Sequence, residues 1–135
     1  MSDDHYTITL DHERRLVHVT AQGEFEIKTG DELIIKSMNI AAEHQYNILC
    51  NVRASRAKAD LGDWFFLPRR LGVYKDLKSR NTRTAILVSP GRQENVYRYF
   101  ETVAVNVGLR IKVFLDETKA LEWLDEPSAP SVSRE

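Results

Sequence analysis

The sequence has a single cysteine, no long hydrophobic run and almost no net charge, and each shortage excludes a class of protein. Because Cys50 is the only cysteine, no internal disulfide can form, and a reducing compartment, the cytoplasm, is the expected location. No apolar run approaches the roughly 20 residues of a membrane-spanning helix, and the acidic residues 1–5 are unlike a secretory signal. The 19 basic and 20 acidic residues nearly cancel, which argues against a general nucleic-acid binder.

The charge is unevenly distributed along the chain. Residues 1–52 carry four basic and nine acidic side chains, residues 53–83 carry nine basic and three acidic ones, and the remainder carries six and eight. The middle third is therefore a basic segment between two acidic ones.

The hydrophobic pattern predicts alternating strands and helices. Residues 6–10 and 16–21 alternate apolar with polar or β-branched side chains and predict an antiparallel hairpin. Short apolar runs predict three further strands, at residues 48–52, 84–88 and 111–115. Apolar residues at helical spacing predict four helices, at residues 29–44, from 64 or 68 to 77, at 96–107 and from 116 onward.

Capping residues mark three of the predicted helix ends. Thr29 followed by Glu32 forms a capping box at the start of the first helix. Gly108 ends the third helix, and Asp116 caps the start of the last one.

This order, ββαβαβαβα, predicts an α/β fold with a mixed, mostly parallel sheet and its first strand at an antiparallel edge. The chain of 135 residues suits a single domain. We assign residues 1–126 to that domain and expect residues 127–135 to form a disordered tail.

Three stretches carry a resemblance to a known fold. They are the hairpin at residues 7–19, the strand end Asn51-Val52-Arg53, and residues 112–117 together with 120–124. The chain resembles the STAS fold of sporulation anti-sigma-factor antagonists, and more closely a group of bacterial STAS/SEC14-like proteins without assigned function. The resemblance spans nearly the whole chain and implies the fold rather than an activity.

The resemblance also identifies a departure from the family. Anti-sigma antagonists accept phosphate on a serine in a turn after the third strand, which falls on residues 59–62 here. Asp60 stands at the acceptor position. An aspartate is no substrate for a serine kinase, although it places a permanent negative charge there.

The sequence contains no recognisable catalytic or metal-binding motif, and we expect no cofactor, no metal and no enzymatic activity. The four histidines fall on separate elements without metal-ligand spacing. We interpret His18 as a partly exposed surface residue, and Cys50 as a small buried hydrophobic residue rather than a nucleophile.

Ligands of parallel α/β sheets gather beyond the carboxyl ends of the strands. This rule predicts a binding cluster made of Arg53, Ser55, Arg56, Lys58, Asp60, Ser89 and Arg92. Its cations near two helix starts suit an anion such as phosphate, a nucleotide or an acidic peptide. The alternative is a solvated loop at residues 53–62, with Arg53 held by a carbonyl or a carboxylate.

Residues 64–67 place Trp64, Phe65, Phe66 and Leu67 in succession. Successive helical side chains point about 100° apart, so these four cannot all face one core. They either form a satellite core or a patch that binds a partner, an anionic lipid surface or a second copy. The open edge of the hairpin is the other route to a homodimer.

Two functions therefore remain. The preferred one is a non-enzymatic regulatory or protein-interaction module that uses Trp64, Phe65 and the 53–62 segment. The alternative is a carrier of an anionic small molecule or lipid, with an apolar pocket near the aromatic residues.

Overall fold

The computed structural model describes residues 6–58, 82–106 and 108–126 of the chain. Five strands and three helices lie within these residues. In chain order they are β1 (Tyr6–Asp11), β2 (Leu16–Glu26), α1 (Ile27–His44), β3 (Asn47–Lys58), β4 (Arg83–Leu87), α3 (Arg92–Asn106), β5 (Arg110–Phe114) and α4 (Glu117–Asp125). The helix predicted between residues 64 and 77 and the tail at 127–135 lie outside the described residues.

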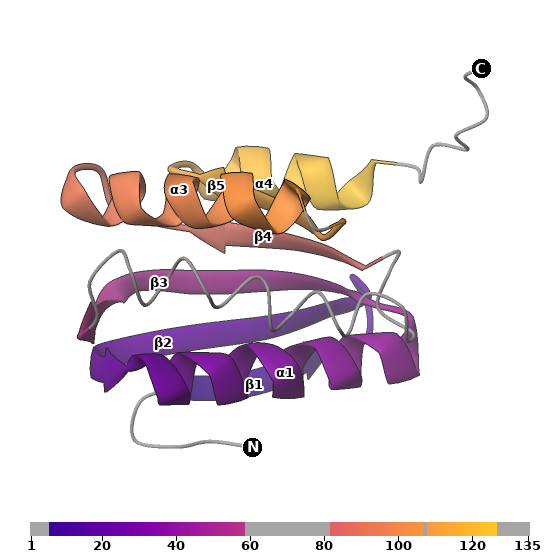
Figure 1. Ribbon diagram of the computed structural model, residues 1–135. Helices are drawn as coiled ribbons and strands as arrows, with labels where there is room; N and C mark the ends of the chain where they lie inside the picture. Colours follow the sequence, from indigo (N-terminus) through magenta and orange to yellow (C-terminus); the bar gives the residue numbers. More distant parts are fainter. Residues whose placement is uncertain (1–5, 59–81, 107, 127–135) are drawn as a thin grey trace.

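The strands form one sheet in the order β1-β2-β3-β4-β5 (Figure 1). β1 is antiparallel to β2, and every other neighbouring pair is parallel. The predicted mixed, mostly parallel sheet with an antiparallel first strand at its edge is confirmed. β5 forms the opposite edge.

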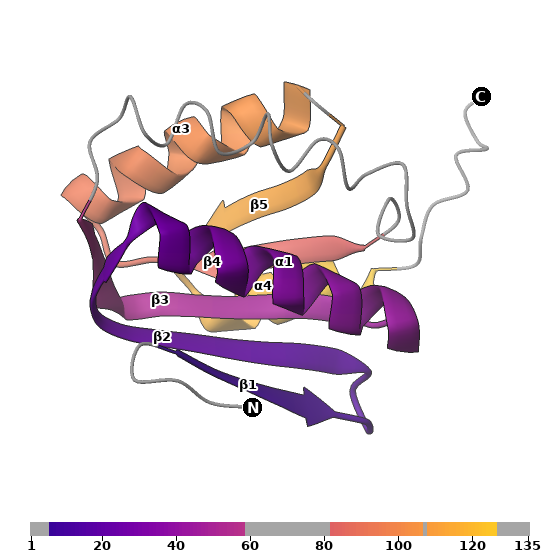
Figure 2. The same ribbon diagram turned by 60° about the horizontal axis from the view of Figure 1, so that its bottom comes forward.

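Helices cover both faces of the sheet, with α1 and α3 on one side and α4 on the other (Figure 2). Two separate apolar clusters result. The larger lies beneath α1 and α3 and includes Val17, Val19 and Phe100, and the smaller lies beneath α4 and includes Leu49 and Leu87. The strands β3 and β4 contribute to both clusters because they are covered on both faces, which explains the short apolar runs at residues 48–52 and 84–88.

α1 covers one face of the hairpin, and on the other face Leu16, at the start of β2, belongs to the cluster beneath α4. Tyr6 and Ile8 are buried on the α1 side, whereas Thr7, Thr9 and Thr20 are exposed. This alternation follows from the two-residue period of a strand, and it places a row of hydroxyl groups on an open face.

The start of α1 differs from the prediction. The helix begins at Ile27, with Glu26 as its N-cap and no side-chain hydrogen bond to the cap. The predicted capping box at Thr29 and Glu32 is therefore wrong, because Thr29 already lies inside the helix. β2 runs to Glu26 and leads directly into α1, so the paired strand end, rather than a hydroxyl cap, sets where the helix starts.

Two other predicted helix ends are confirmed. The Asp116 carboxylate accepts hydrogen bonds from the amides of Thr118 at 2.8 Å and Lys119 at 3.4 Å, which caps α4. Gly108 has a φ of 94° just beyond α3, a conformation that glycine adopts without strain.

Arg83 anchors the end of α4 to the start of β4. Its side chain is buried, and its Nη1 donates to the carbonyl oxygens of Trp123 at 2.7 Å and Glu126 at 2.8 Å. The guanidinium also lies 5.8 Å from the centre of the Trp123 ring. A helix leaves its last carbonyls without internal partners, and a buried cation satisfies them here.

None of the helices in the described part of the chain is both long enough and apolar enough to cross a membrane.

Candidate functional site

The carboxyl ends of β3 and β4 meet the starts of α3 and α4 at one end of the sheet. The predicted residues Arg53, Ser55 and Arg56 lie in β3, Ser89 follows β4, and Arg92 begins α3. We call these five residues the carboxyl-end site. The topology thus places them at the same end of the sheet, as the strand-end rule predicts.

Residues 53–58 belong to a strand, so the predicted loop over 53–62 is wrong in this part. After a register shift between Thr20 and Gln22, β2 continues beside β3 and pairs Gln22 with Ala54 through to Glu26 with Lys58. The polar sequence of β3 is compatible with a strand because its backbone groups are satisfied by β2 rather than by water. Lys58 ends β3, but its side chain, Asp60, Trp64 and Phe65 lie outside what the structure describes.

The Gln93 side chain forms hydrogen bonds to each of the two strand ends that form the site. Its Oε1 accepts a hydrogen bond from the Ser89 amide at 2.6 Å, and its Nε2 donates to the carbonyl oxygens of Val52 at 2.8 Å and Ser55 at 2.9 Å. The Ser55 hydroxyl donates to the Val52 carbonyl at 2.7 Å. One amide side chain at the start of α3 therefore holds the end of β3 and the β4–α3 connection in a defined conformation.

The two arginines of β3 are paired with carboxylates. Arg53 Nη2 lies 3.5 Å from Glu117 Oε1, and Arg53 Nε donates to Asn51 Oδ1 at 3.0 Å. Arg56 Nη1 lies 3.7 Å from Glu24 Oε2. The alternative in which a carboxylate holds Arg53 matches this geometry. The site is thus a surface of both charge signs, with Arg92 exposed beside it.

Gln93, Glu117 and Glu24 were not identified from the sequence. Nothing in the spacing of a single glutamine or glutamate distinguishes it from a solvated surface residue. Only the strand order places Gln93 against β3, 38 residues from Ser55 in the chain, and places Glu117 beside Arg53.

The structure brings together two of the histidines that the sequence shows on separate elements. His12 Nδ1 lies 2.7 Å from the Tyr46 hydroxyl, and the His12 and His44 ring centres are 6.0 Å apart. His44 Nδ1 lies 3.1 Å from the Ile40 carbonyl, which can only accept, so this nitrogen carries the proton. Within residues 6–58, 82–106 and 108–126, no group of three His, Cys, Asp or Glu side chains is placed to hold a metal ion.

His18 lies at the surface, as predicted. Its side chain is 35% exposed, and its Nε2 lies 3.7 Å from Asp11 Oδ2. A contact of this length between exposed groups contributes little to stability.

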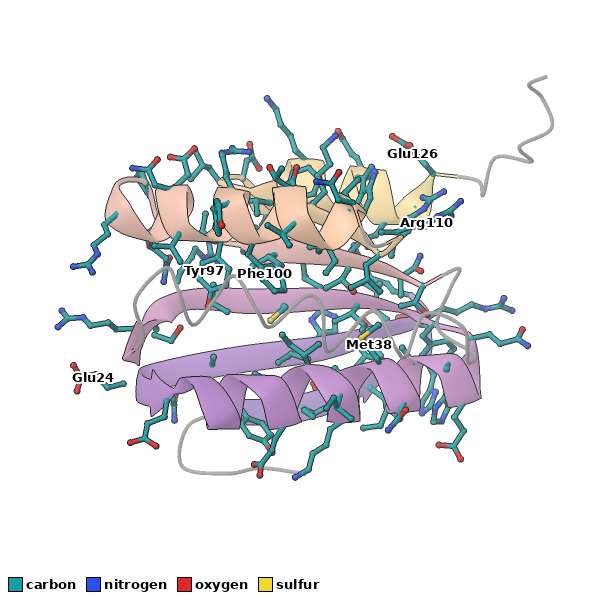
Figure 3. The ribbon with its side chains drawn as sticks, in the orientation of Figure 1. Glu24, Met38, Tyr97, Phe100, Arg110 and Glu126 are labelled. Carbon is teal, nitrogen blue, oxygen red and sulfur yellow. The ribbon has the colours of Figure 1, made fainter. Side chains whose placement is uncertain are left out.

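An apolar cavity of about 50 Å³ lies between the sheet and the helices α1 and α3. Figure 3 shows Met38 on α1, and Tyr97 and Phe100 on α3, which line it together with Cys50. A cavity of roughly 150 Å³ is needed to bind a molecule the size of benzene. This space is therefore too small for a lipid chain within the part of the molecule that the structure describes.

Cys50 is half-buried and packs against the larger apolar cluster, which corrects the prediction of a fully buried side chain. Desolvation raises the pKa of its thiol to about 12, so at pH 8 its thiolate fraction is about a thousandfold below that of an ordinary cysteine. Burial also raises the pKa of Tyr97, the next ionisable group in the cavity.

We therefore expect Cys50 to react with a thiol reagent such as Ellman's reagent more slowly in the native protein than in denaturant. The measurement is the labelling rate at pH 8 with and without guanidinium at a denaturing concentration, and the denatured sample is its own control. Native labelling at the denatured rate would contradict the assignment of Cys50 as an inert core residue.

The strand order and the two helical layers define a class, a SpoIIAA-like α/β domain. No protein-family model and no curated protein matches the chain. Among solved structures, an uncharacterised protein of the DUF3478 family from Shewanella loihica PV-4, itself described as having a SpoIIAA-like fold, is similar to it with a TM-score of 0.58. The similarity covers 92% of this chain and 98% of that one, at 18% sequence identity. This similarity confirms the STAS-like fold, and function has to be argued from the residues of the site.

Proposed function

We propose that this protein is a non-enzymatic regulatory module that binds a protein partner through the carboxyl-end site. The observation that supports the proposal is the set of three hydrogen bonds made by the Gln93 side chain. These bonds hold the backbone beneath an exposed surface of both charge signs. A preorganised site binds a partner with higher affinity, because its backbone loses little conformational entropy on binding.

The pairing of the arginines favours a protein over a free anion. Each arginine of β3 already has a carboxylate within 3.7 Å. These carboxylates partly neutralise the positive charge that would attract a small anion. The Arg53 and Arg56 side chains remain 39% and 79% exposed. Exposed ion pairs contribute at most about 1 kcal/mol, so carboxylates of a partner can replace Glu117 and Glu24 at little cost, and arginine is a frequent anchor of interfaces.

The carrier alternative receives less support. It needs an enclosed apolar space, and the apolar cavity beneath α1 and α3, at about 50 Å³, is too small for a lipid.

The proposal is tested by reversing the charge of both arginines in the variant R53E/R56E. We expect the partner captured from the native host by the tagged wild-type chain to be lost, and its affinity as a purified protein to fall at least about tenfold. Capture followed by quantitative mass spectrometry identifies the partner, and calorimetry measures the affinity.

The matched control is R14E/R15E, which makes the same charge change in the exposed turn between β1 and β2, at the other end of β2. Equal binding by wild type and control, with loss in R53E/R56E, supports the proposal. Equal loss in both variants would indicate a general charge effect, and retention in R53E/R56E would place the interface elsewhere.

A further inference from the structure

A groove of about 410 Å³ lies along β5, at the amino end of this edge strand. One wall comes from α3, with Glu101 and Val105, and the other from the end of α4, with Trp123 and Glu126. Residues 109–112 form its floor. Pockets that bind small molecules measure roughly 300–1,000 Å³. We call this space the β5 groove, and its size is that of a small-molecule site.

The β5 groove is formed by the fold itself, because two helices on opposite faces of the sheet end beside β5. After α3 the chain turns at Gly108, whose φ is 94°, and the Leu109 amide donates to the Ala104 carbonyl at 3.0 Å. At the end of α4, Arg83 donates to two carbonyls and lies 5.8 Å from the centre of the Trp123 ring. Both walls are therefore held in place without a ligand, as in most small-molecule sites.

One part of the β5 groove is apolar. Leu109 and Ile111 form a buried floor, and the Val105 side chain above it is 51% exposed. Trp123 is half-buried, and its ring centre lies 5.7 Å from that of Phe114. A ligand ring that covers the valine and the exposed part of the tryptophan would remove apolar surface from water, which favours binding.

The other part of the β5 groove is positively charged. Arg110 and Lys112 are both exposed, and they point to the same face of β5 because side chains alternate along a strand. Among the described residues, neither of them forms an ion pair. Of the two carboxylates in the groove, Glu101 accepts from the Val113 amide at 2.7 Å, and Glu126 is exposed (Figure 3). Two cations are thus open to an anion from solution.

We propose that the β5 groove binds a small aromatic carboxylate. Its ring lies against Val105 and Trp123, and its carboxylate binds Arg110 and Lys112. The guanidinium of arginine matches a carboxylate with two parallel hydrogen bonds, and lysine adds a second charge.

The charges and the size of the groove both favour this class of ligand. Arg53 and Arg56 at the carboxyl-end site have carboxylate partners, whereas the two cations of the β5 groove have none among the described residues. A stable protein interface covers about 800 Å² on each partner, so a groove of about 410 Å³ suits a small molecule better than a protein surface.

The test is a titration of the full-length protein, labelled with nitrogen-15, with 2-naphthoate at neutral pH. We expect saturable shifts of the amide signals of residues 109–112 and of the Trp123 indole signal in nuclear magnetic resonance spectra. The uncharged 2-naphthamide has the same ring system, and its dissociation constant should be at least about tenfold higher, because it makes no charge-assisted hydrogen bonds.

Two variants change the affinity in opposite directions. R110Q/K112Q removes both cations and should raise the dissociation constant of naphthoate at least about tenfold, with that of naphthamide unchanged. E126Q removes the exposed carboxylate and should lower the naphthoate constant about two- to threefold. The matched control R14Q/R15Q removes two positive charges in the turn between β1 and β2 and should bind naphthoate like wild type.

Three results would overturn the inference. They are the absence of saturable shifts up to about 10 mM naphthoate, shifts centred outside the β5 groove, and equal affinities for naphthoate and naphthamide. The inference does not depend on the proposed function, because the β5 groove and the carboxyl-end site lie at opposite ends of the parallel strands. R53E/R56E should therefore bind naphthoate like wild type whether or not the carboxyl-end site binds a protein.

Discussion

Replacing Phe100 with alanine is expected to lower the free energy of unfolding by about 3–5 kcal/mol, the range found for buried phenylalanines. The Phe100 side chain is 1% exposed, meets the Tyr97 ring edge-on at 6.4 Å and lines the cavity beneath α3. Removing the ring enlarges a cavity that already measures about 50 Å³, and the surroundings relax only partly. Urea denaturation followed by circular dichroism measures the change.

A residue on the exposed side of the same helix provides the control. Val105 is also apolar and helical but is 51% exposed, so V105A should change the unfolding free energy by less than about 1 kcal/mol. Similar losses in the two variants would show that α3 does not bury the face that contains Phe100. A loss below about 1 kcal/mol in F100A would show the same.

The substitution Q93E is expected to destabilise the protein by about 2–3 kcal/mol although it hardly changes the shape of the side chain. The carboxylate can still accept from the Ser89 amide but can no longer donate to the carbonyls of Val52 and Ser55. Two donor bonds are thus replaced by repulsion between oxygens. The attraction of a negative charge to the start of α3 offsets at most about 1 kcal/mol of this loss.

The control for Q93E is N95D, which makes the same amide-to-carboxylate change at an exposed position in the first turn of α3. It should be neutral or slightly stabilising. Near pH 4 the carboxyl group introduced by Q93E is partly protonated and regains one donor, so the deficit of this variant should shrink there and grow as the pH rises. Equal stability of Q93E and wild type at neutral pH, measured by urea denaturation, would show that Gln93 does not hold the site.

Most elements were predictable from local pattern. The hairpin, the three later strands and the ends of α3 and α4 follow from two- and 3.6-residue periods and from capping residues such as Asp116. The errors lie where β2 and β3 extend past their apolar segments. Residues 53–58 look like a polar loop because the strand that satisfies their backbone, the second half of β2, is distant in the chain.

The strand-end rule predicted a binding cluster of Arg53, Ser55, Arg56, Lys58, Asp60, Ser89 and Arg92. Five of them lie in β3, just after β4 or at the start of α3, and their role in binding stays a prediction. The rule did not reveal that the arginines are paired or that Gln93 holds the backbone, because those partners come from other elements and carry no local signal.

The class of fold and the order of the described elements follow from short-range periodicity and composition, and the sequence contains no recognisable catalytic motif. Tertiary structure decided the rest. It placed β1 and β5 at the two edges of the sheet and brought the Glu101 carboxylate to the Val113 amide of β5, because both depend on strand order. It also paired Arg53 with Glu117, since ion pairs form between side chains that the fold, rather than the chain, makes neighbours.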